Sequence, residues 1–300
     1  MKPDLPWLRG CATALVTPFR GADAGIDEAA LRKLVDHQID NGVKLLVPCG
    51  TTGETATTSE AEDRRIMQVV IEQARGRAKI IAGTGSNSTQ SAIDYTRSAK
   101  KLGADAVLVV APYYNKPTQA GLIAHFRAVA EAAEGMPVVL YNVPGRTGVN
   151  MTAATTLELA RHVPNVAAVK EASGDLAQIM AILRARPEGF RVFSGDDAIT
   201  FAVMAMGGEG VVSVAGNEAP RLMSDLCNLC LAGKWDDARR LHFRLLPLME
   251  ANFIESSPGP VKAALALMGL IEDRLRLPLV PVQESTRQRL AQVLGELELL

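Results

Sequence analysis

Residues 79–114, KIIAGTGSNSTQSAIDYTRSAKKLGADAVLVVAPYY, contain two short apolar runs with an amphipathic segment between them. The runs at 79–85 and 106–114 have the length and composition of buried strands. The intervening segment, 90–104, has apolar residues at helical spacing and a glycine near its end, which predicts a helix. A strand, a helix and a second strand in this order predict two parallel strands joined by a helical crossover.

The same alternation continues along most of the chain. Amphipathic segments such as 27–42 separate eight apolar runs, which lie at 11–19, 44–50, 79–85, 106–114, 137–144, 166–173, 190–197 and 210–217. Eight such units predict an α/β fold of the (β/α)8 TIM-barrel type, whose usual size is about 250 residues. A doubly wound open sheet is the alternative, and it would normally carry a glycine-rich dinucleotide fingerprint after its first strand. Segment 17–25, TPFRGADAG, is not such a fingerprint.

The pattern changes from Ser224 onward. Strand-like runs stop there, and the remaining segments have apolar residues at helical spacing. We therefore expect a (β/α)8 catalytic barrel at residues 1–223 and a C-terminal helical domain at residues 224–300.

The composition argues against nucleic-acid-binding and membrane-spanning classes of protein. The chain of 300 residues is 48% hydrophobic and 4% aromatic with a net charge of -1, so we expect no nucleic-acid partner. No apolar run reaches the roughly 20 residues that span a membrane. The N-terminal segment MKPDLPWLRG lacks the apolar core of a signal peptide, so we expect a cytoplasmic protein.

The cysteines and histidines do not predict a metal centre. Cys227 and Cys230 form a C-x-x-C inside a helical pattern, with no second cysteine or histidine pair nearby, so buried thiols are the better interpretation. The four histidines lie in helical patterns or beside turns, where structural or solvated roles are the usual ones. We expect neither a metal nor a cofactor.

Polar side chains gather at the C-terminal ends of the expected strands, where TIM barrels place their working residues. These side chains are Thr51 and Thr52 in GTTGE, Tyr113 and Tyr114, Tyr141, Arg146 in NVPGRTG, and Lys170 at the end of an apolar run. Taken one at a time, each has a structural interpretation, and for Lys170 it is a strand-end cation paired with a neighbour such as Glu171. Their joint placement on one rim favours catalysis.

A lysine beside tyrosines, without a metal, indicates carbonyl chemistry. A desolvated amine loses its proton more readily, and the free amine attacks a ketone to form a Schiff base. A tyrosine can then relay protons, and Arg146 could hold a carboxylate through two parallel hydrogen bonds.

Six short motifs indicate a resemblance to a known family. They are GTTGE (50–54), PYYNKP (112–117), YNVPGRTG (141–148), KEASGD (170–175), SGDD (194–197) and ESSPGPVK (255–262). In sequence and in order along nearly the whole chain, they resemble the dihydrodipicolinate synthase family. The resemblance implies 4-hydroxy-tetrahydrodipicolinate synthase activity, which condenses pyruvate with L-aspartate-4-semialdehyde in diaminopimelate and lysine biosynthesis.

The resemblance also assigns roles, beginning with four catalytic residues. Lys170 corresponds to the Schiff-base lysine and Tyr141 to the tyrosine that relays protons at the imine. Thr51 corresponds to the threonine that bridges two relay tyrosines, and Tyr114 to the tyrosine that enters the neighbouring subunit's active site. The family is usually a homotetramer built as a dimer of tight dimers, and Tyr114 requires at least the tight dimer.

Four further residues correspond to substrate-binding positions in the family. Thr52 corresponds to the residue that binds the pyruvate carboxylate, and Arg146 to the arginine that receives the carboxylate of the semialdehyde. Gly195 and Val212 correspond to backbone contacts near the lysine.

Many bacterial and plant members are inhibited by lysine at the tight-dimer interface, and the chain departs from that site. Thr55, Ala56, Asn87 and Tyr113 correspond to it. Inhibited bacterial members often carry histidines at the positions of Glu60 and Asp63, and a glutamate at the position of Ser91. Since Ser91 lacks the carboxylate that would hold the ammonium group of lysine, we expect weak or absent inhibition.

Three alternatives remain open. Another Schiff-base enzyme of the superfamily, such as N-acetylneuraminate lyase or a keto-deoxy-sugar-acid aldolase or dehydratase, would share Lys170 and Tyr141, whereas Thr51 and Arg146 favour the synthase. A barrel that binds without catalysing would not need Lys170 or Tyr141. A metal-dependent aldolase would need histidine ligands, and the rim offers only acids that we expect to orient loops or pair with cations, namely Glu54, Glu171, Asp196 and Asp197.

Overall fold

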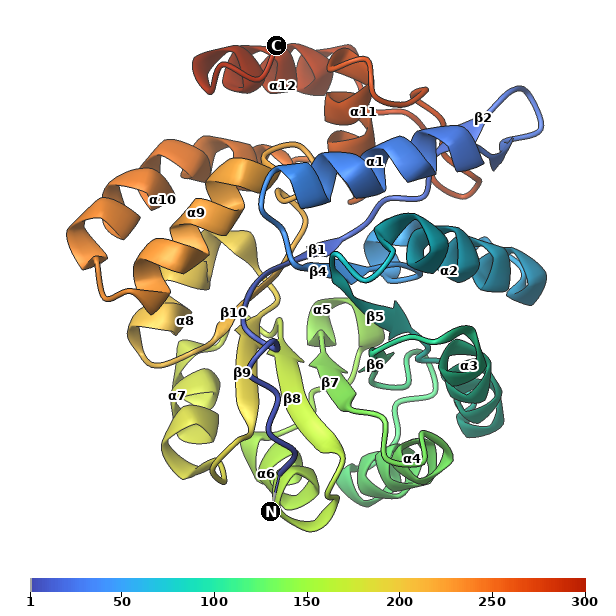
Figure 1. Cartoon of the computed structure of the whole chain (residues 1–300), viewed down its shortest axis with the longest axis vertical. Helices are drawn as coiled ribbons and strands as arrows, with labels where there is room; N and C mark the ends of the chain where they lie inside the picture. Colours follow the sequence, from blue (N-terminus) through green and yellow to red (C-terminus); the bar gives the residue numbers. More distant parts are fainter. Residues whose placement is uncertain (1) are drawn as a thin grey trace.

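The computed structural model describes residues 2–300 and contains a closed barrel of parallel strands (Figure 1). The strands lie around the barrel in the order β1-β10-β9-β8-β7-β6-β5-β4. Their bounds are β1 Gly10–Ala14, β4 Leu45–Val47, β5 Lys79–Gly83, β6 Ala106–Val110, β7 Val138–Asn142, β8 Val166–Glu171, β9 Arg191–Ser194 and β10 Gly210–Ser213. All eight expected strands are present, so the TIM-barrel prediction is confirmed.

The chain also forms helices, most of which follow a strand and cover the barrel from outside (Figure 1). They are α1 Glu28–Asp40, α2 Glu60–Ala74, α3 Thr89–Leu102, α4 Gln119–Ala132, α5 Pro144–Thr147, α6 Ala153–His162, α7 Leu176–Ala185, α8 Thr200–Ala205, α9 Pro220–Leu231, α10 Trp235–Ala251, α11 Gly259–Leu267 and α12 Glu284–Glu296. The chain also forms a small hairpin and two 3₁₀ turns, which are β2 Phe19–Arg20, β3 Gly25–Ile26, η1 Thr51–Gly53 and η2 Asp197–Ile199.

Short polar side chains fix where most barrel helices begin. The Ser59 hydroxyl accepts from the Glu62 amide, and the Glu62 carboxylate accepts from the Ser59 amide at 2.8 Å, which is a capping box. Other helices begin after an N-cap side chain that accepts from their first turn, at Asp27, Ser88, Thr118, Thr152 and Asp175. These caps end the strand-to-helix loops at defined residues, and those loops form the rim.

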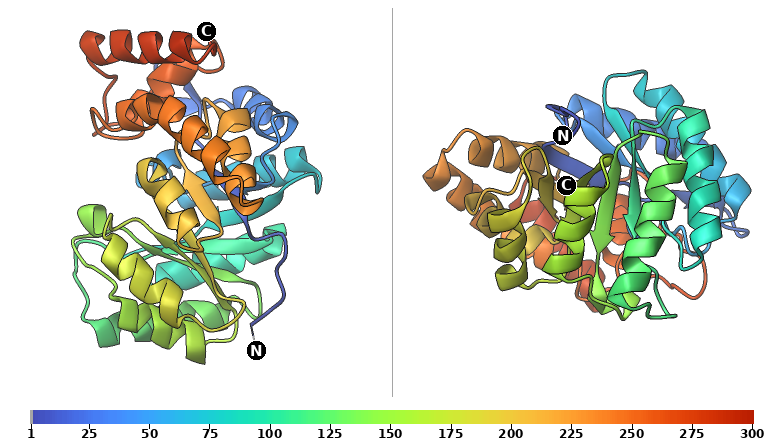
Figure 2. Two further views of the ribbon diagram at one scale, coloured as in Figure 1. Left: turned by 90° about the vertical axis from the view of Figure 1, so that its left-hand side faces the viewer. Right: turned by 90° about the horizontal axis from the view of Figure 1, so that it is seen from below.

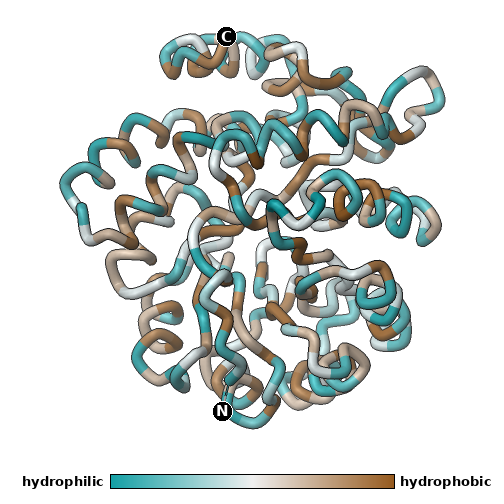
Figure 3. The backbone as a smooth tube through the Cα atoms, in the orientation of Figure 1, coloured by the Kyte–Doolittle hydropathy of each residue, from teal (hydrophilic) through white to brown (hydrophobic). Residues whose placement is uncertain are grey.

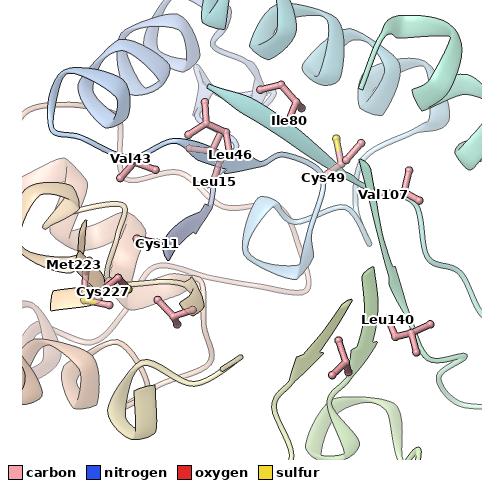
Figure 4. Close-up of a cluster of buried hydrophobic side chains, with 14 of the residues drawn as sticks. Cys11, Leu15, Val43, Leu46, Cys49, Ile80, Val107, Leu140, Met223 and Cys227 are labelled. Atoms are coloured by element: carbon pink, nitrogen blue, oxygen red, sulfur yellow. The ribbon is translucent and has the colours of Figure 1, made fainter. Parts of the chain in front are cut away.

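The strands divide two layers of apolar side chains. Ala168 belongs to the cluster inside the barrel, and Val169 belongs to the cluster between the barrel and the helices. Figure 4 shows the outer layer, with Leu46, Ile80 and Leu140 among its members. In Figure 3 the helices carry hydrophilic and hydrophobic residues along the same length, as the expected amphipathic pattern requires.

The C-terminal helices gather at one end of the molecule, away from the N-terminus (Figure 2). Helix α11 packs Val261 and Leu265 against Val16, Leu34 and Val214. Val16 lies two residues after the end of β1 and Val214 directly follows β10, so α11 covers part of the C-terminal rim of the barrel.

The expected boundary between residues 223 and 224 falls inside helix α9, which packs on β1. The division into residues 1–223 and 224–300 therefore stays a prediction. Across residues 2–300, no helix combines the length and apolar character of a membrane span.

The loop after β10 contains a fully buried carboxyl group. The Glu218 side chain has no exposed surface and lies beside the Asn252 side chain, which is also buried. Burial raises the pKa of Glu218 from about 4.5 to about 8, because the charged form loses its hydration. At neutral pH the Glu218 carboxyl therefore holds a proton in the native protein, whereas in the unfolded chain the same carboxyl is ionised.

This burial predicts a specific pH dependence of stability. Between about pH 4.5 and 8 the native carboxyl holds a proton that the unfolded one has lost, so the free energy of unfolding falls as pH rises through this window. One proton accounts for a slope of at most about 1.4 kcal/mol per pH unit. Glu218→Gln replaces the carboxyl with a side chain that does not titrate. Between pH 5 and pH 8 the wild type should therefore lose more unfolding free energy than the variant. Urea titrations at both pH values measure it, and a pH-independent difference would contradict the raised pKa.

Candidate active site

Lys170 and Tyr141 lie side by side on neighbouring strands. The register between β7 and β8 pairs Tyr141 with Lys170, and both side chains point to the inside of the barrel mouth. The Lys170 Nζ lies 4.1 Å from the centre of the Tyr141 ring. Lys170 is 5% exposed and Tyr141 6% exposed, so the amine and the ring are largely shielded from water.

Glu171 points to the opposite face of the same strand. Its carboxylate accepts hydrogen bonds from Asn142 Nδ2 at 3.1 Å, the Ser173 amide at 2.8 Å and Gln178 Nε2 at 3.1 Å. Burial raises the pKa of Glu171, and these donors act in the opposite direction. Because adjacent strand residues face opposite sides, Glu171 faces the layer between the barrel and the helices and does not pair with Lys170. The structural interpretation of Lys170 as a cation paired with Glu171 is wrong.

Two threonines reach the site from the 3₁₀ turn after β4. Thr51 and Thr52 belong to η1, which packs closely on the chain after β1. The Gly53 carbonyl accepts from Thr17 Oγ1 at 2.7 Å, and a Cβ on Gly53 would lie 3.1 Å from the Leu15 carbonyl oxygen. Glycine at this position therefore allows the close approach that brings both threonines to the rim.

Arg146 reaches the site from α5, the short helix directly after β7. Its Nη2 donates to the Ser257 carbonyl oxygen at 3.3 Å. Ser257 lies in the connection between α10 and α11 and is 5% exposed. The C-terminal segment thus orients the guanidinium of a barrel residue.

These side chains surround one small cavity of about 150 Å³. Its lining combines an amine, a phenol, hydroxyls, a guanidinium and a carboxylate with apolar walls, from Thr51, Thr52, Tyr141, Val143, Arg146, Lys170, Ala172, Gly195, Asp196, Val214, Phe253 and Ser257. Six of the eight predicted catalytic and substrate-binding residues therefore meet at one place, which are Lys170, Tyr141, Thr51, Thr52, Arg146 and Gly195.

Two predicted residues lie elsewhere. Val212 is 3% exposed and packs inside the barrel, and Val214 lines the cavity in its place. Tyr114 is 87% exposed, does not line this cavity, and has a φ of 73° in the left-handed region. A tyrosine held outward in this backbone conformation is available to another surface.

A second cavity of about 410 Å³ adjoins the first and shares Thr51 and Arg146 with it. Of the residues predicted for a lysine site, Thr55, Ala56 and Tyr113 line it. Asn87 does not line this cavity, and its carbonyl oxygen accepts from Asn115 Nδ2 at 2.9 Å.

Asp63 also lines the second cavity, where hydroxyl groups surround its carboxylate. It accepts from Thr55 Oγ1 at 3.0 Å and from Thr58 Oγ1 at 2.6 Å. Burial raises the pKa of Asp63, and these hydroxyls act against that shift. Glu60 lies nearby on α2 and pairs with Arg64 at 2.9 Å.

The sequence did not identify Phe253 and Ser257 as lining residues. Both come from the connection before α11, which folds back over the rim. The motif ESSPGPVK was a signal for this segment, because it belongs to the family pattern although it lies outside the barrel strands. Among residues 2–300, no group of three or more histidine, cysteine, aspartate or glutamate side chains has a geometry that could hold a metal ion.

Comparisons with known proteins agree with this geometry. The model of the Dihydrodipicolinate synthetase family matches residues 7–297. The 4-hydroxy-tetrahydrodipicolinate synthase of Acidobacterium capsulatum is 52% identical over 294 residues, which cover 98% of this chain and 97% of that protein.

Solved structures are similar over the same length. The chloride-inhibited dihydrodipicolinate synthase from Acinetobacter baumannii, complexed with pyruvate, is 43% identical with a TM-score of 0.95 and covers 98% of this chain and 100% of that one. The lysine-bound enzyme from Cyanidioschyzon merolae is 43% identical with a TM-score of 0.95 and covers 98% of this chain and 99% of that one. From its sequence, its barrel and its site, the chain belongs to the dihydrodipicolinate synthetase family.

Proposed function

We propose that this chain is a 4-hydroxy-tetrahydrodipicolinate synthase that condenses pyruvate with L-aspartate-4-semialdehyde. The observation that carries the proposal is the buried Lys170 amine beside the Tyr141 ring, in a cavity that also holds Thr51, Thr52 and Arg146. The pyruvate complex of the A. baumannii relative supports pyruvate as the first substrate.

The site supports a reaction through a covalent imine. The free Lys170 amine attacks the pyruvate ketone, and water leaves as the C–N double bond forms. The iminium withdraws electrons from the methyl carbon, which loses a proton to give an enamine. The enamine carbon then attacks the aldehyde of the second substrate and forms the new C–C bond, and the aldehyde oxygen takes up a proton. The amino group of the semialdehyde then attacks the imine carbon and displaces the Lys170 amine, which closes the ring and frees the enzyme. Tyr141, whose ring lies against the amine, relays the protons that these steps move.

The remaining cavity residues bind the substrates in this proposal. Thr52 binds the pyruvate carboxylate and Gly195 is a backbone contact beside Lys170, whereas Val212 packs inside the barrel and does not line the cavity. Arg146 receives the carboxylate of the semialdehyde, because a guanidinium can hold a carboxylate through two parallel hydrogen bonds. Thr51 and Arg146 are also the residues that favour the synthase over N-acetylneuraminate lyase and the sugar-acid aldolases.

A second copy of the chain completes the site in this proposal. Tyr114 is 87% exposed and does not line its own cavity, which supports its insertion into a neighbouring copy's site, where Thr51 bridges it to Tyr141. We propose a homotetramer built as a dimer of tight dimers. We also propose a cytoplasmic location, since all four cysteines are free and buried, which suits a reducing compartment.

Borohydride trapping tests the proposed function. We expect incubation with pyruvate followed by reduction to add a mass adduct on Lys170. Lys170→Arg keeps the positive charge but should form no adduct and lose turnover by several orders of magnitude, because guanidinium stays protonated. A wild-type protein without an adduct would overturn the proposal. An adduct with no consumption of aspartate semialdehyde would assign a different acceptor aldehyde, as in the related aldolases.

Gly195 provides a test of how closely the Lys170 side chain is held. A Cβ on residue 195 would lie 2.5 Å from the Ala172 Cβ and 3.1 Å from the Lys170 Cγ and Cε. Gly195→Ala should therefore displace Lys170 and slow adduct formation by about tenfold or more. Gly295→Ala is the matched control, because a Cβ on that residue meets no atom within 4 Å. A Gly195→Ala rate equal to wild type would show that Lys170 tolerates the displacement.

Lysine should inhibit this protein weakly or not at all. Ser91 offers no carboxylate, Asp63 is already bonded to two threonine hydroxyls, and Glu60 is paired with Arg64. We expect turnover to stay near its uninhibited value at sub-millimolar lysine, and Ser91→Glu to increase the sensitivity. Half-complete inhibition of the wild type at sub-millimolar lysine would contradict this expectation.

A further inference from the structure

A fully buried ion pair lies behind the threonine turn of the active site. The Lys262 Nζ lies 2.6 Å from the Glu54 Oε1, and neither side chain has any exposed surface. Glu54 directly follows η1, and Lys262 belongs to α11 of the C-terminal segment. The pair therefore connects the turn that carries Thr51 and Thr52 to a helix outside the barrel.

The Glu54 backbone is itself part of the turn. Its amide donates to the Thr51 carbonyl oxygen at 3.1 Å, and its φ of 57° lies in the left-handed region. The second carboxylate oxygen accepts from the Arg276 amide at 3.1 Å. Both oxygens of Glu54 are thus held by the C-terminal segment, while its backbone ends the turn, so a shift of the carboxylate would shift the turn.

The Lys262 ammonium makes two further contacts on the barrel side. It donates to the Thr17 carbonyl oxygen at 3.0 Å and lies 4.2 Å from the centre of the Phe19 ring. The Thr17 hydroxyl in turn donates to the Gly53 carbonyl oxygen at 2.7 Å. Lys262 therefore contacts the turn by two routes, directly through Glu54 and indirectly through Thr17.

The same stretch of chain also orients the opposite wall of the cavity. The Ser257 carbonyl oxygen, which precedes α11, accepts from Arg146 Nη2 at 3.3 Å. The hydroxyl side and the guanidinium side of the cavity are both held by residues 257–262.

Stability alone is a poor reason for such a pair. Burial lowers the pKa of the Lys262 amine and the charge of Glu54 opposes that shift, so the ammonium depends on its partner. Removing two charges from water is costly, and an apolar pair of similar size is often equally stable or more stable. A directional ion pair does fix geometry, which an apolar contact does not.

We propose that the Glu54–Lys262 pair is a positioning device for the pyruvate step. Neither residue lines the cavity, and they act by fixing where η1 presents Thr51 and Thr52. The inference rests on the proposed function for its kinetic consequence, but the coupling between the pair and the turn is a property of the fold.

The test uses full-length protein and three variants, Lys262→Met, Glu54→Gln and the double variant. Each should lower kcat/KM for pyruvate by about tenfold or more, because the carboxylate-binding hydroxyl is misplaced, while KM for the semialdehyde changes by less than about twofold. The single variants leave one buried group without its partner and should lose stability, whereas the double variant should recover much of it. Its kinetic defect should persist.

Arg186→Met is the matched control. Arg186 pairs with Glu209 at 2.7 Å, with side chains 22% and 12% exposed, where α7 ends and β10 begins, which is the opposite end of the barrel. This variant should lose stability but keep wild-type kcat/KM for pyruvate. Hydrogen exchange at residues 50–58 should accelerate in the three pair variants and stay unchanged in the control.

The outcomes separate the positioning role from a merely structural one. A double variant that recovers kcat/KM together with stability would overturn the proposal, and so would unchanged exchange at residues 50–58. If Lys262→Met does not fold, the double variant and Glu54→Gln give the same decision. A wild-type protein that forms no pyruvate adduct would instead refute the proposed function, and the exchange measurement would still decide whether the pair holds the turn.

Discussion

The alternation of side chains along β8 is the constraint on which the site depends. Ala168 and Lys170 face the barrel interior, and Val169 and Glu171 face the helices. A slip of one residue would place the Glu171 carboxylate inside and the Lys170 amine among the helices. The register with β7, which sets Tyr141 opposite Lys170, fixes the same choice from the neighbouring strand. Packing of the two apolar layers therefore determines which of two adjacent ionisable groups meets the cavity.

The fold was readable from the sequence because buried parallel strands are nearly continuous apolar runs. The extension of β8 to Glu171 was harder to see, because a carboxylate rarely ends a buried strand without a donor such as Asn142, which is 29 residues away in sequence. The hairpin of β2 and β3 has strands of two residues each, too short for any periodic signal. The helical periodicity is continuous across α9, so it does not indicate where the barrel ends.

The lining residues that directly follow strands could be predicted from the sequence, whereas those brought to the cavity by tertiary packing could not. Lys170, Tyr141 and Arg146 could be placed because strand ends share a rim in this fold. Phe253 and Ser257 join them only because α11 docks Val261 and Leu265 on the loops after β1 and β10. Part of that docking depends on contacts more than 200 residues apart in sequence, and the Glu54–Lys262 pair is separated by 208 residues. Local patterns carry no information about such contacts.

The two buried lysines show how differently one residue type can be surrounded inside the same protein. Lys262 Nζ lies 4.2 Å from the centre of a phenylalanine ring, and Lys170 Nζ lies 4.1 Å from the centre of a tyrosine ring, so aromatic contact does not distinguish them. The carboxylate of Glu54 at 2.6 Å favours the charged form of Lys262, which cannot act as a nucleophile while it is protonated. Lys170 instead lines the cavity, with the Tyr141 ring as its neighbour. A buried amine that lines a cavity is available to an electrophile. A buried amine enclosed by its counter-ion instead holds neighbouring parts of the chain in place.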